Sequence, residues 1–212
     1  MTGTFKMTSS ENISETITAD VNLLADEAIK DHGKMRNIVK LLYDEDLMRR
    51  FTAAKALGEI AKREPELMQR RWERIFRSFD DTMSCWGAAE ALGEIARNLP
   101  AYRNRIAIFM KVFKKDDCSC QGYIWGMCRI CQVERDKIKD FVQELEAFLN
   151  SSNACIRGQA LWALGELRVQ EMAERMKCFL EDEGETWYYD NEAANRGKIK
   201  TIVEEALRKM RH

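Results

Sequence analysis

The sequence predicts an all-α protein, an α-solenoid of stacked helix pairs with a small C-terminal cap. The string at residues 53–60 recurs in register at 88–95, and the same offset separates Pro65 from Pro100. Prolines are scarce, with 2 in 212 residues, and alternating runs of Val, Ile and Thr are missing until the end of the chain. A repeat of this length is typical of supersecondary units that bury their apolar faces only by stacking.

Each predicted unit begins with a helix. At residues 88–95, apolar side chains fall at i, i+3, i+4 and i+7, which places them on one stripe of an α-helix. The pattern returns at 123–130 and 160–167. Acidic and hydroxyl residues between the units are suited to cap these helices. These predicted turns are 44–46, 80–81, 116–117 and 151–153.

A second helix is predicted in each unit after a short break. Pro65 and Pro100 suit the first turn of this helix, because the N–H that proline lacks would be unpaired there. The predicted second helices are 66–79, 101–113, 136–149 and 171–180.

The N-terminal end of the chain departs from the repeat. Residues 1–19 are rich in Ser and Thr and are predicted to form a flexible tail. A weaker helix pair is predicted at 20–31 and 34–43, separated by His32 and Gly33. With this pair, the predicted solenoid spans residues 20–185.

The predicted cap comprises residues 186–212 and forms a lid on the last repeat. Its aromatic segment at 186–189 is a candidate strand that would pair with 198–200 as a short hairpin. Thr201 followed by Glu204 has the spacing of a capping box, which predicts a final helix through Met210.

Composition narrows the function classes. Lys and Arg total 34 against 35 for Asp and Glu, so the whole molecule has no strong attraction for nucleic acid or an anionic membrane. No run reaches the roughly 18 apolar residues of a membrane span, and the first residues lack the apolar core of a secretory signal. The 7 cysteines are scattered over helices, which is typical of reduced thiols. We therefore expect a cytoplasmic protein.

The repeated Ala-x-x-Ala-Leu-Gly-x-Ile string resembles the HEAT repeat, in particular the variant named after phycobilisome lyases. The resemblance covers residues 45–181 and implies stacked helix pairs whose second helices line a concave side. Arg50 and Arg157 match the arginine that usually precedes the string, whereas Cys85 and Cys120 replace it in the middle copies. The family includes scaffolds, chromophore lyases and many proteins of unknown role, so the resemblance implies a fold more than a function.

Large aromatic residues mark one column of the predicted first helices. Trp125 and Trp162 stand where earlier copies have Lys55 and Glu90, about 200° around the helix from the core direction, and Trp86 is predicted to face a similar outer side. An exposed tryptophan often marks a contact site. Three interpretations remain open: cover by the N-terminal tail or the aromatic segment at 187–189, a partner-binding site, and scattered surface residues.

Basic residues gather on two predicted second helices. Arg71 and Arg74 lie on one, and Arg103 and Arg105 lie on the next, where no acidic residue occurs between Ala101 and Lys115. If both helices line the concave side, they form a positive surface suited to an acidic protein segment or a phosphate backbone. A solvated helix face is the simpler interpretation. Among the functional ones, an acidic protein partner is favoured, because no aromatic stacking motif interleaves the arginines.

Catalytic and metal sites are not predicted. Only His32 and His212 occur, and no phosphate-binding glycine motif is present. Cys118, Cys120, Cys128 and Cys131 resemble a ligand set, but Cys120 and Cys131 would lie about 16 Å apart along one helix. Packing thiols are therefore predicted, and no cofactor is expected.

The sequence thus favours a non-catalytic protein-interaction scaffold or adaptor. The predicted partner-binding residues are listed together here: Arg71, Arg74, Arg103, Arg105, Trp86, Trp125 and Trp162. The alternative is a DNA-binding or base-excision repair protein of the HEAT-like type, and a chromophore lyase is a weaker alternative that rests on the resemblance alone.

Overall fold

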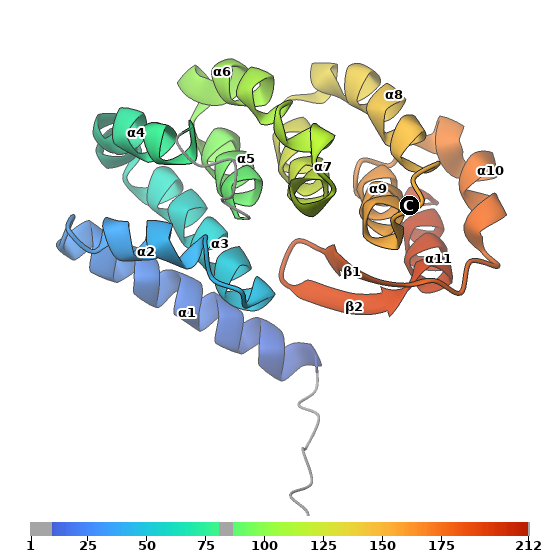
Figure 1. Cartoon of the computed structure of the whole chain (residues 1–212), viewed down its shortest axis with the longest axis horizontal. Helices are drawn as coiled ribbons and strands as arrows, with labels where there is room; N and C mark the ends of the chain where they lie inside the picture. The colour runs from blue at the N-terminus through green and yellow to red at the C-terminus, as the bar shows by residue number, and fades with distance from the viewer. Residues whose placement is uncertain (1–9, 81–86, 212) are drawn as a thin grey trace, which may run out of the picture.

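The computed structural model describes the backbone of residues 10–80 and 87–211, with side chains there except at 10–19, 73–75, 78–80 and 118. This part of the chain is mostly helical and carries a two-stranded antiparallel sheet near its C-terminal end (Figure 1). The predicted helical class is therefore confirmed, and the candidate hairpin is present.

Helices that carry the repeated string lie side by side in an inner row (Figure 1). Small residues allow their close approach: a Cβ on Gly93 would lie 2.3 Å from the Gly126 Cα atom, and one on Gly165 would lie 2.5 Å from the Ala206 Cβ atom. The helices with the string are α3 (Leu47–Arg63), α5 (Ala88–Asn98), α7 (Asp117–Cys131) and α9 (Ala154–Glu166), and α11 (Ile199–Met210), which lacks the string, completes the row.

Side-chain caps begin three of these helices. Asp46 accepts hydrogen bonds from the backbone N–H groups at the start of α3, Asp116 does so for α7, and Asn153 does so for α9. Each satisfies amides that have no partner within the helix. These caps lie in the turns where the sequence predicts them, whereas residue 81 of the predicted 80–81 turn is outside the described residues.

The second helices of the pairs form an outer arc (Figure 1). This arrangement corrects the expectation from the family resemblance, which placed the second helices on the concave side. The helices rich in Gly and Ala crowd at the smaller radius, whereas Trp72, Phe76 and Phe109 on the second helices need more room. The arc consists of α4 (Pro65–Asp80), α6 (Pro100–Met110), α8 (Ile138–Phe148) and α10 (Ala173–Met176).

Helix α1 (Ser10–Lys30) packs along α3, and α2 (Met35–Leu41) follows it (Figure 1). The predicted break at His32 and Gly33 is present between them. Residues 10–19 are helical rather than part of a tail, in keeping with the i, i+4 spacing of Ile13, Ile17 and Val21. The rest of the predicted tail, residues 1–9, lies outside the described residues.

The hairpin joins β1 (Glu185–Tyr189) to β2 (Ala194–Lys198), with Tyr189 opposite Ala194. The second strand is earlier in the chain than predicted, and Lys198 begins α11 without a side-chain cap, so the predicted capping box at Thr201 is wrong. The hairpin extends across the inner row toward α3 (Figure 1). It therefore covers more than the last repeat.

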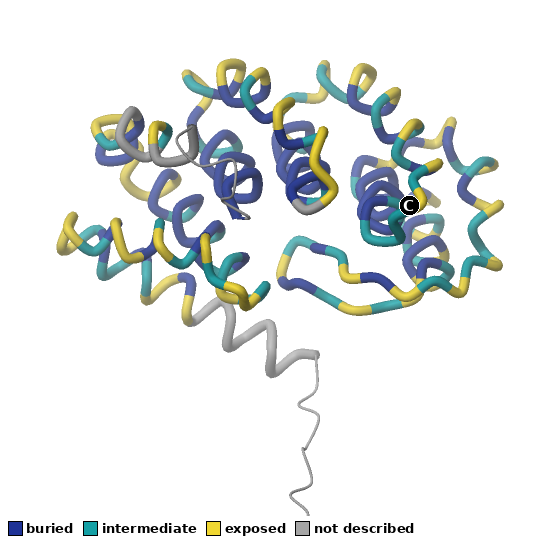
Figure 2. The backbone as a smooth tube through the Cα atoms, in the orientation of Figure 1, coloured by how far each residue is buried: buried dark blue, intermediate teal, exposed yellow. Residues whose placement is uncertain are grey.

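One continuous apolar core runs from α1 to α11, and its buried residues concentrate along the inner row (Figure 2). In the described part of the chain, no helix combines the length and the apolar character needed to cross a bilayer.

Candidate functional site

The residue column that the sequence predicts to face outward lies under the hairpin. Lys55, Glu90, Trp125 and Trp162 occupy equivalent places on four inner helices, and Trp125 is 0% exposed. The Trp125 ring centroid lies 5.9 Å from that of Tyr189. The prediction that Trp125 and Trp162 face outward is therefore wrong: the hairpin covers Trp125, and Trp162, which is 4% exposed, lies beside Tyr188 of the hairpin and Ala206 of α11. This is the first of the three interpretations above.

Inner-row side chains bind the peptide groups of the hairpin tip. The Gln159 amide donates to the Tyr189 carbonyl oxygen at 2.9 Å and accepts from the Tyr189 N–H at 2.6 Å. The indole N–H of Trp125 donates to the Asp190 carbonyl oxygen at 2.9 Å, and Lys55 Nζ donates to the Asn191 carbonyl oxygen at 2.9 Å. Side chains from α3, α7 and α9 thus hold three consecutive residues, the last of β1 and the first two of the hairpin turn.

A charged network continues from the hairpin tip into the inner row. Arg129 Nε lies 2.9 Å from Glu94 Oε1, with both side chains at most 5% exposed, and Lys55 Nζ is 3.4 Å from the same oxygen. The Asn191 side chain accepts from Arg129 at 2.6 Å and donates to Glu166 at 2.7 Å. Burial raises the pKa of Glu94, and the Lys55 charge opposes that shift. The hairpin tip completes this network, so its position is specified by charge as well as by packing.

Glu90 is buried beside the same hairpin, with 2% of its surface exposed. The Tyr189 hydroxyl and the positive charge of Arg50 favour its carboxylate form, whereas Glu90 Oε2 is buried without a hydrogen-bond partner among the described residues. It also lies so close to α7 that a Cβ on Gly122 would be 2.4 Å from Glu90 Oε2. Burial disfavours the carboxylate and raises the pKa of Glu90 to about 7.

The predicted basic residues do not form one surface. Arg103 is buried, where it donates to the Ala96 and Arg97 carbonyl oxygens and pairs with Glu134 at 3.2 Å, so its prediction as an exposed contact residue is wrong. Because α4 and α6 lie in the outer arc, their arginines do not line the concave side (Figure 1). Arg71 is half-buried, and Arg105 is exposed with its guanidinium 5.1 Å from the Phe76 ring centroid. The Arg74 side chain and Trp86 lie outside the described residues.

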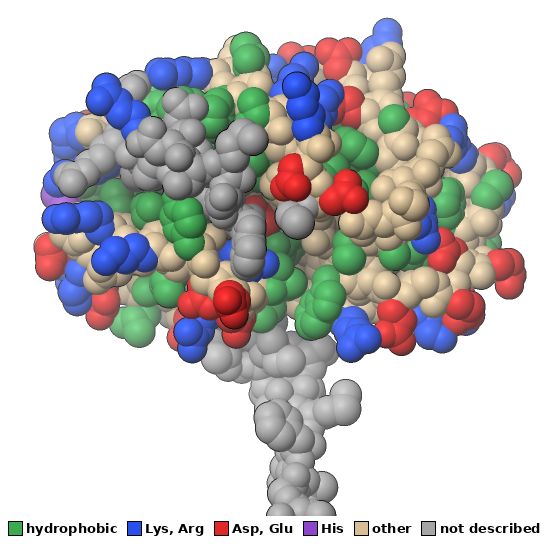
Figure 3. Space-filling model, in the orientation of Figure 1, with side chains coloured by type: hydrophobic (Ala, Val, Ile, Leu, Met, Phe, Trp, Pro, Cys, Tyr) green, Lys and Arg blue, Asp and Glu red, His purple; other side chains and the backbone are tan. Residues whose placement is uncertain are grey.

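The exposed side of α6 and of the segment that follows it, through Lys115, combines apolar and basic side chains. Ile108 is 71% exposed and Val112, four residues later, is 49% exposed. Arg105, Lys111 and Lys115 are exposed on the same segment. In Figure 3, Lys and Arg side chains lie over α6 and the segment that follows it.

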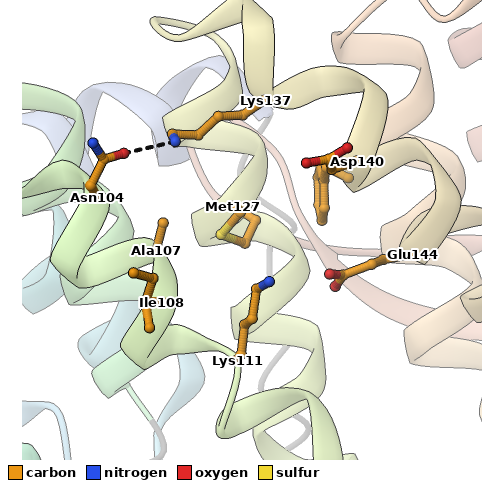
Figure 4. A pocket seen from close by; sticks show the side chains of 9 residues that line it. Asn104, Ala107, Ile108, Lys111, Met127, Lys137, Asp140 and Glu144 are labelled. Carbon is orange, nitrogen blue, oxygen red and sulfur yellow. Dashed lines mark hydrogen bonds between the residues drawn. The ribbon is translucent and has the colours of Figure 1, made fainter.

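A groove of about 200 Å³ separates α6 from α8 (Figure 4). Its floor is apolar and includes Met127 of α7 and Phe141 of α8. Ile108 and Lys111 line the α6 side, and Lys137 bridges the groove at one end by donating to Asn104 at 2.8 Å (Figure 4). Asp140 and Glu144 line the α8 side.

The cysteines of the middle repeats pack in the interior. Cys120, Cys128 and Cys131 are buried, and burial raises the pKa of the Cys120 and Cys131 thiols to about 12. Thiols with such pKa values are poorly reactive and poor metal ligands near neutral pH. Within the residues that the structure describes, no group of three or more His, Cys, Asp or Glu side chains is arranged to hold a metal ion.

Ile108 and Val112 were absent from the predicted site. A signal for them exists in the sequence, since they are spaced by four residues within a segment that has no acidic residue. Two aliphatic residues one turn apart are equally typical of a buried stripe, and only the arrangement of α6 in the outer arc distinguishes these cases.

No protein-family model and no curated protein matches the chain. Among solved structures, the chain is similar to the crystal structure of an engineered protein from the Northeast Structural Genomics Consortium. The identity is 17% and the TM-score 0.53, over 97% of this chain and 93% of that one. This likeness concerns the fold alone.

Proposed function

We propose that the protein is a non-catalytic interaction scaffold, a HEAT-like α-solenoid that binds an acidic amphipathic segment of a partner protein along α6. The observation that carries this proposal is the exposure of Ile108 and Val112 one helical turn apart within a basic segment. Exposed aliphatic side chains flanked by charges are typical of docking surfaces for an amphipathic helix.

The positive charges of residues 101–115 favour a negatively charged partner segment. Arg105, Lys111 and Lys115 are exposed around the two aliphatic side chains, and the segment from Ala101 to Lys115 has no acid of its own. An acidic partner would be steered to this surface and held in register by it. Basic segments would be repelled.

The α6–α8 groove supports the same proposal by providing an anchor. A partner side chain that enters beside Ile108 would meet Met127 and Phe141. Burial of a leucine-sized anchor contributes about 2 kcal/mol to binding. The acids on the α8 side, Asp140 and Glu144, would then disfavour an acidic residue at the anchor position and require an apolar one there.

A random peptide library displayed on phage tests the proposal. Selection on the immobilised protein is expected to enrich peptides with several Asp or Glu and with apolar residues spaced by three or four. The double variant Ile108→Ser with Val112→Ser is expected to lose binding of these peptides. Val133→Ser is the matched control, because Val133 is a 44% exposed aliphatic residue that does not line the groove. Peptides that bind all three proteins equally would contradict the proposal.

Salt-dependent retention on DNA separates the scaffold from the DNA-binding alternative. A surface that reads phosphates through the α6 cations would bind DNA at low salt and lose it steeply as salt rises. The apolar centre at Ile108 and Val112 favours a protein segment instead. If the Ile108→Ser, Val112→Ser double variant still binds DNA at low salt as the wild type does, the DNA-binding alternative is favoured.

A further inference from the structure

A cavity of about 310 Å³ lies on the inner side of the molecule, between α1, α3, α5 and α7. It is separate from the α6–α8 groove. Four cations line it from three different helices: Lys55, Lys62, Arg97 and Arg129. Cations from separate helices converge on one partly open cavity only when the fold brings them together.

The acidic residues of the cavity do not balance these cations. Glu94 and Glu59 are the carboxylates among its described lining residues, so the lining carries an excess of two positive charges. Glu94 is held by Arg129 and Lys55, and Glu59 lies 3.4 Å from Lys62. The chain as a whole has a net charge of −1, so the excess is a local property of this cavity.

Arg97 is the cavity cation whose side chain has no partner among the described residues. In the described residues its guanidinium makes no hydrogen bond or ion pair, and its charge acts on Glu94 only at longer range. The guanidinium is half-buried at the cavity wall. A partly desolvated guanidinium offers a planar set of donors that fits the oxygens of a phosphoryl group.

We propose that this cavity is a binding site for a small phosphate monoester, with Arg97 and Lys62 as its main ligands and Lys55 and Arg129 as the fixed positive background. A phosphoryl dianion matches the excess of two charges. The volume equals that of roughly ten water molecules at about 30 Å³ each, which exceeds what inorganic phosphate fills. Val21 of α1 supplies an apolar wall against which the organic part would pack.

Isothermal titration with glycerol 2-phosphate at constant ionic strength tests this site. We expect saturable binding to the full chain, with weaker binding of inorganic phosphate. Arg97→Gln is expected to weaken the binding about tenfold, the loss of one charge-assisted hydrogen bond. Lys62→Gln, an exposed substitution that leaves the core intact, is expected to weaken it in the same direction.

Matched controls are the cations outside the cavity. Arg105→Gln on α6 and Lys111→Gln directly after it are expected to leave the affinity for glycerol 2-phosphate unchanged. The proposal is overturned if no saturable binding occurs, if Arg97→Gln binds as well as the wild type, or if the α6 variants weaken binding equally. Binding of succinate in preference to both phosphates would also overturn it. Peptide binding at α6 should survive Arg97→Gln, so this proposal and the proposed function can fail independently.

Discussion

The inner and outer helices of one repeat unit show opposite surfaces. On α5, even Glu90 and Glu94 are buried, because α3, α7 and the hairpin surround the helix. On α6 and in the turn that follows it, Ile108 and Val112 remain exposed although they are aliphatic. Residue type alone therefore misleads here: charged residues mark a contact within the chain, and aliphatic residues mark the free surface. What differs is whether another segment of the chain covers the helix.

The largest effect is expected from a substitution at Trp125, on the inner side of the molecule that the hairpin covers. Trp125→Ala removes a side chain that is 0% exposed and that hydrogen-bonds the hairpin. We expect a loss of about 3–5 kcal/mol in the free energy of unfolding, measured by urea denaturation. Trp187→Ala is the matched control, since Trp187 is 45% exposed, and its loss should be clearly smaller. Equal losses would contradict the proposed cover of the inner row.

Burial of Glu90 under the hairpin is expected to make the free energy of unfolding depend on pH. Its pKa is about 7 in the folded protein against 4.5 unfolded, so the folded state holds this proton more tightly. The resulting stabilisation is present at pH 5 and is lost as pH rises through 7. Relative to Glu90→Gln, the wild type should lose about 3 kcal/mol of stability between pH 5 and 8. A difference between the two proteins that stays constant with pH would show that Glu90 is not buried as described.

Close packing of the inner helices gives an effect of intermediate size. Gly93→Ala places a methyl group against the Gly126 backbone, and we expect a destabilisation of about 1–3 kcal/mol by thermal or urea unfolding. Gly33→Ala is the control, because its added methyl group would meet only the flexible Asp31 side chain. If Gly93→Ala is as stable as the wild type, α5 and α7 do not approach as closely as the structure shows.

The smallest effect on stability is expected on the exposed surface at Ile108 and Val112. Ile108→Ser with Val112→Ser should change the free energy of unfolding by less than about 1 kcal/mol in total, since both side chains are largely exposed. The same variant should abolish peptide binding. A destabilisation of several kcal/mol would mean that α6 is covered in solution.

The helices could be predicted from the sequence because their signals are local. The apolar stripe of 88–95, the caps Asp46, Asp116 and Asn153, and the prolines that begin α4 and α6 each depend on neighbouring residues. The strand register was harder, because Asp190 closes a shorter turn than the residue pattern suggested. Its side chain accepts from the N–H groups of Glu192 and Ala193.

The candidate site could not be predicted in the same way, because it depends on contacts between distant segments. Trp125 has the sequence pattern of an outward residue, and only its bond to Asp190, in a different part of the chain, shows that it is covered. Arg103 looks like a free cation in the sequence but satisfies carbonyl oxygens at the end of α5. Arg97 and Lys62 come together only through the packing of α3 on α5.

Hydrogen–deuterium exchange with a library-selected peptide tests most directly the claim that the inner side is closed by the chain itself and the α6 side is open to a partner. We predict slower exchange on peptide binding at residues 104–115 and 137–144, with no change in the hairpin at 185–198. Protection of the hairpin and the inner row, with exchange at α6 unchanged, would contradict the account.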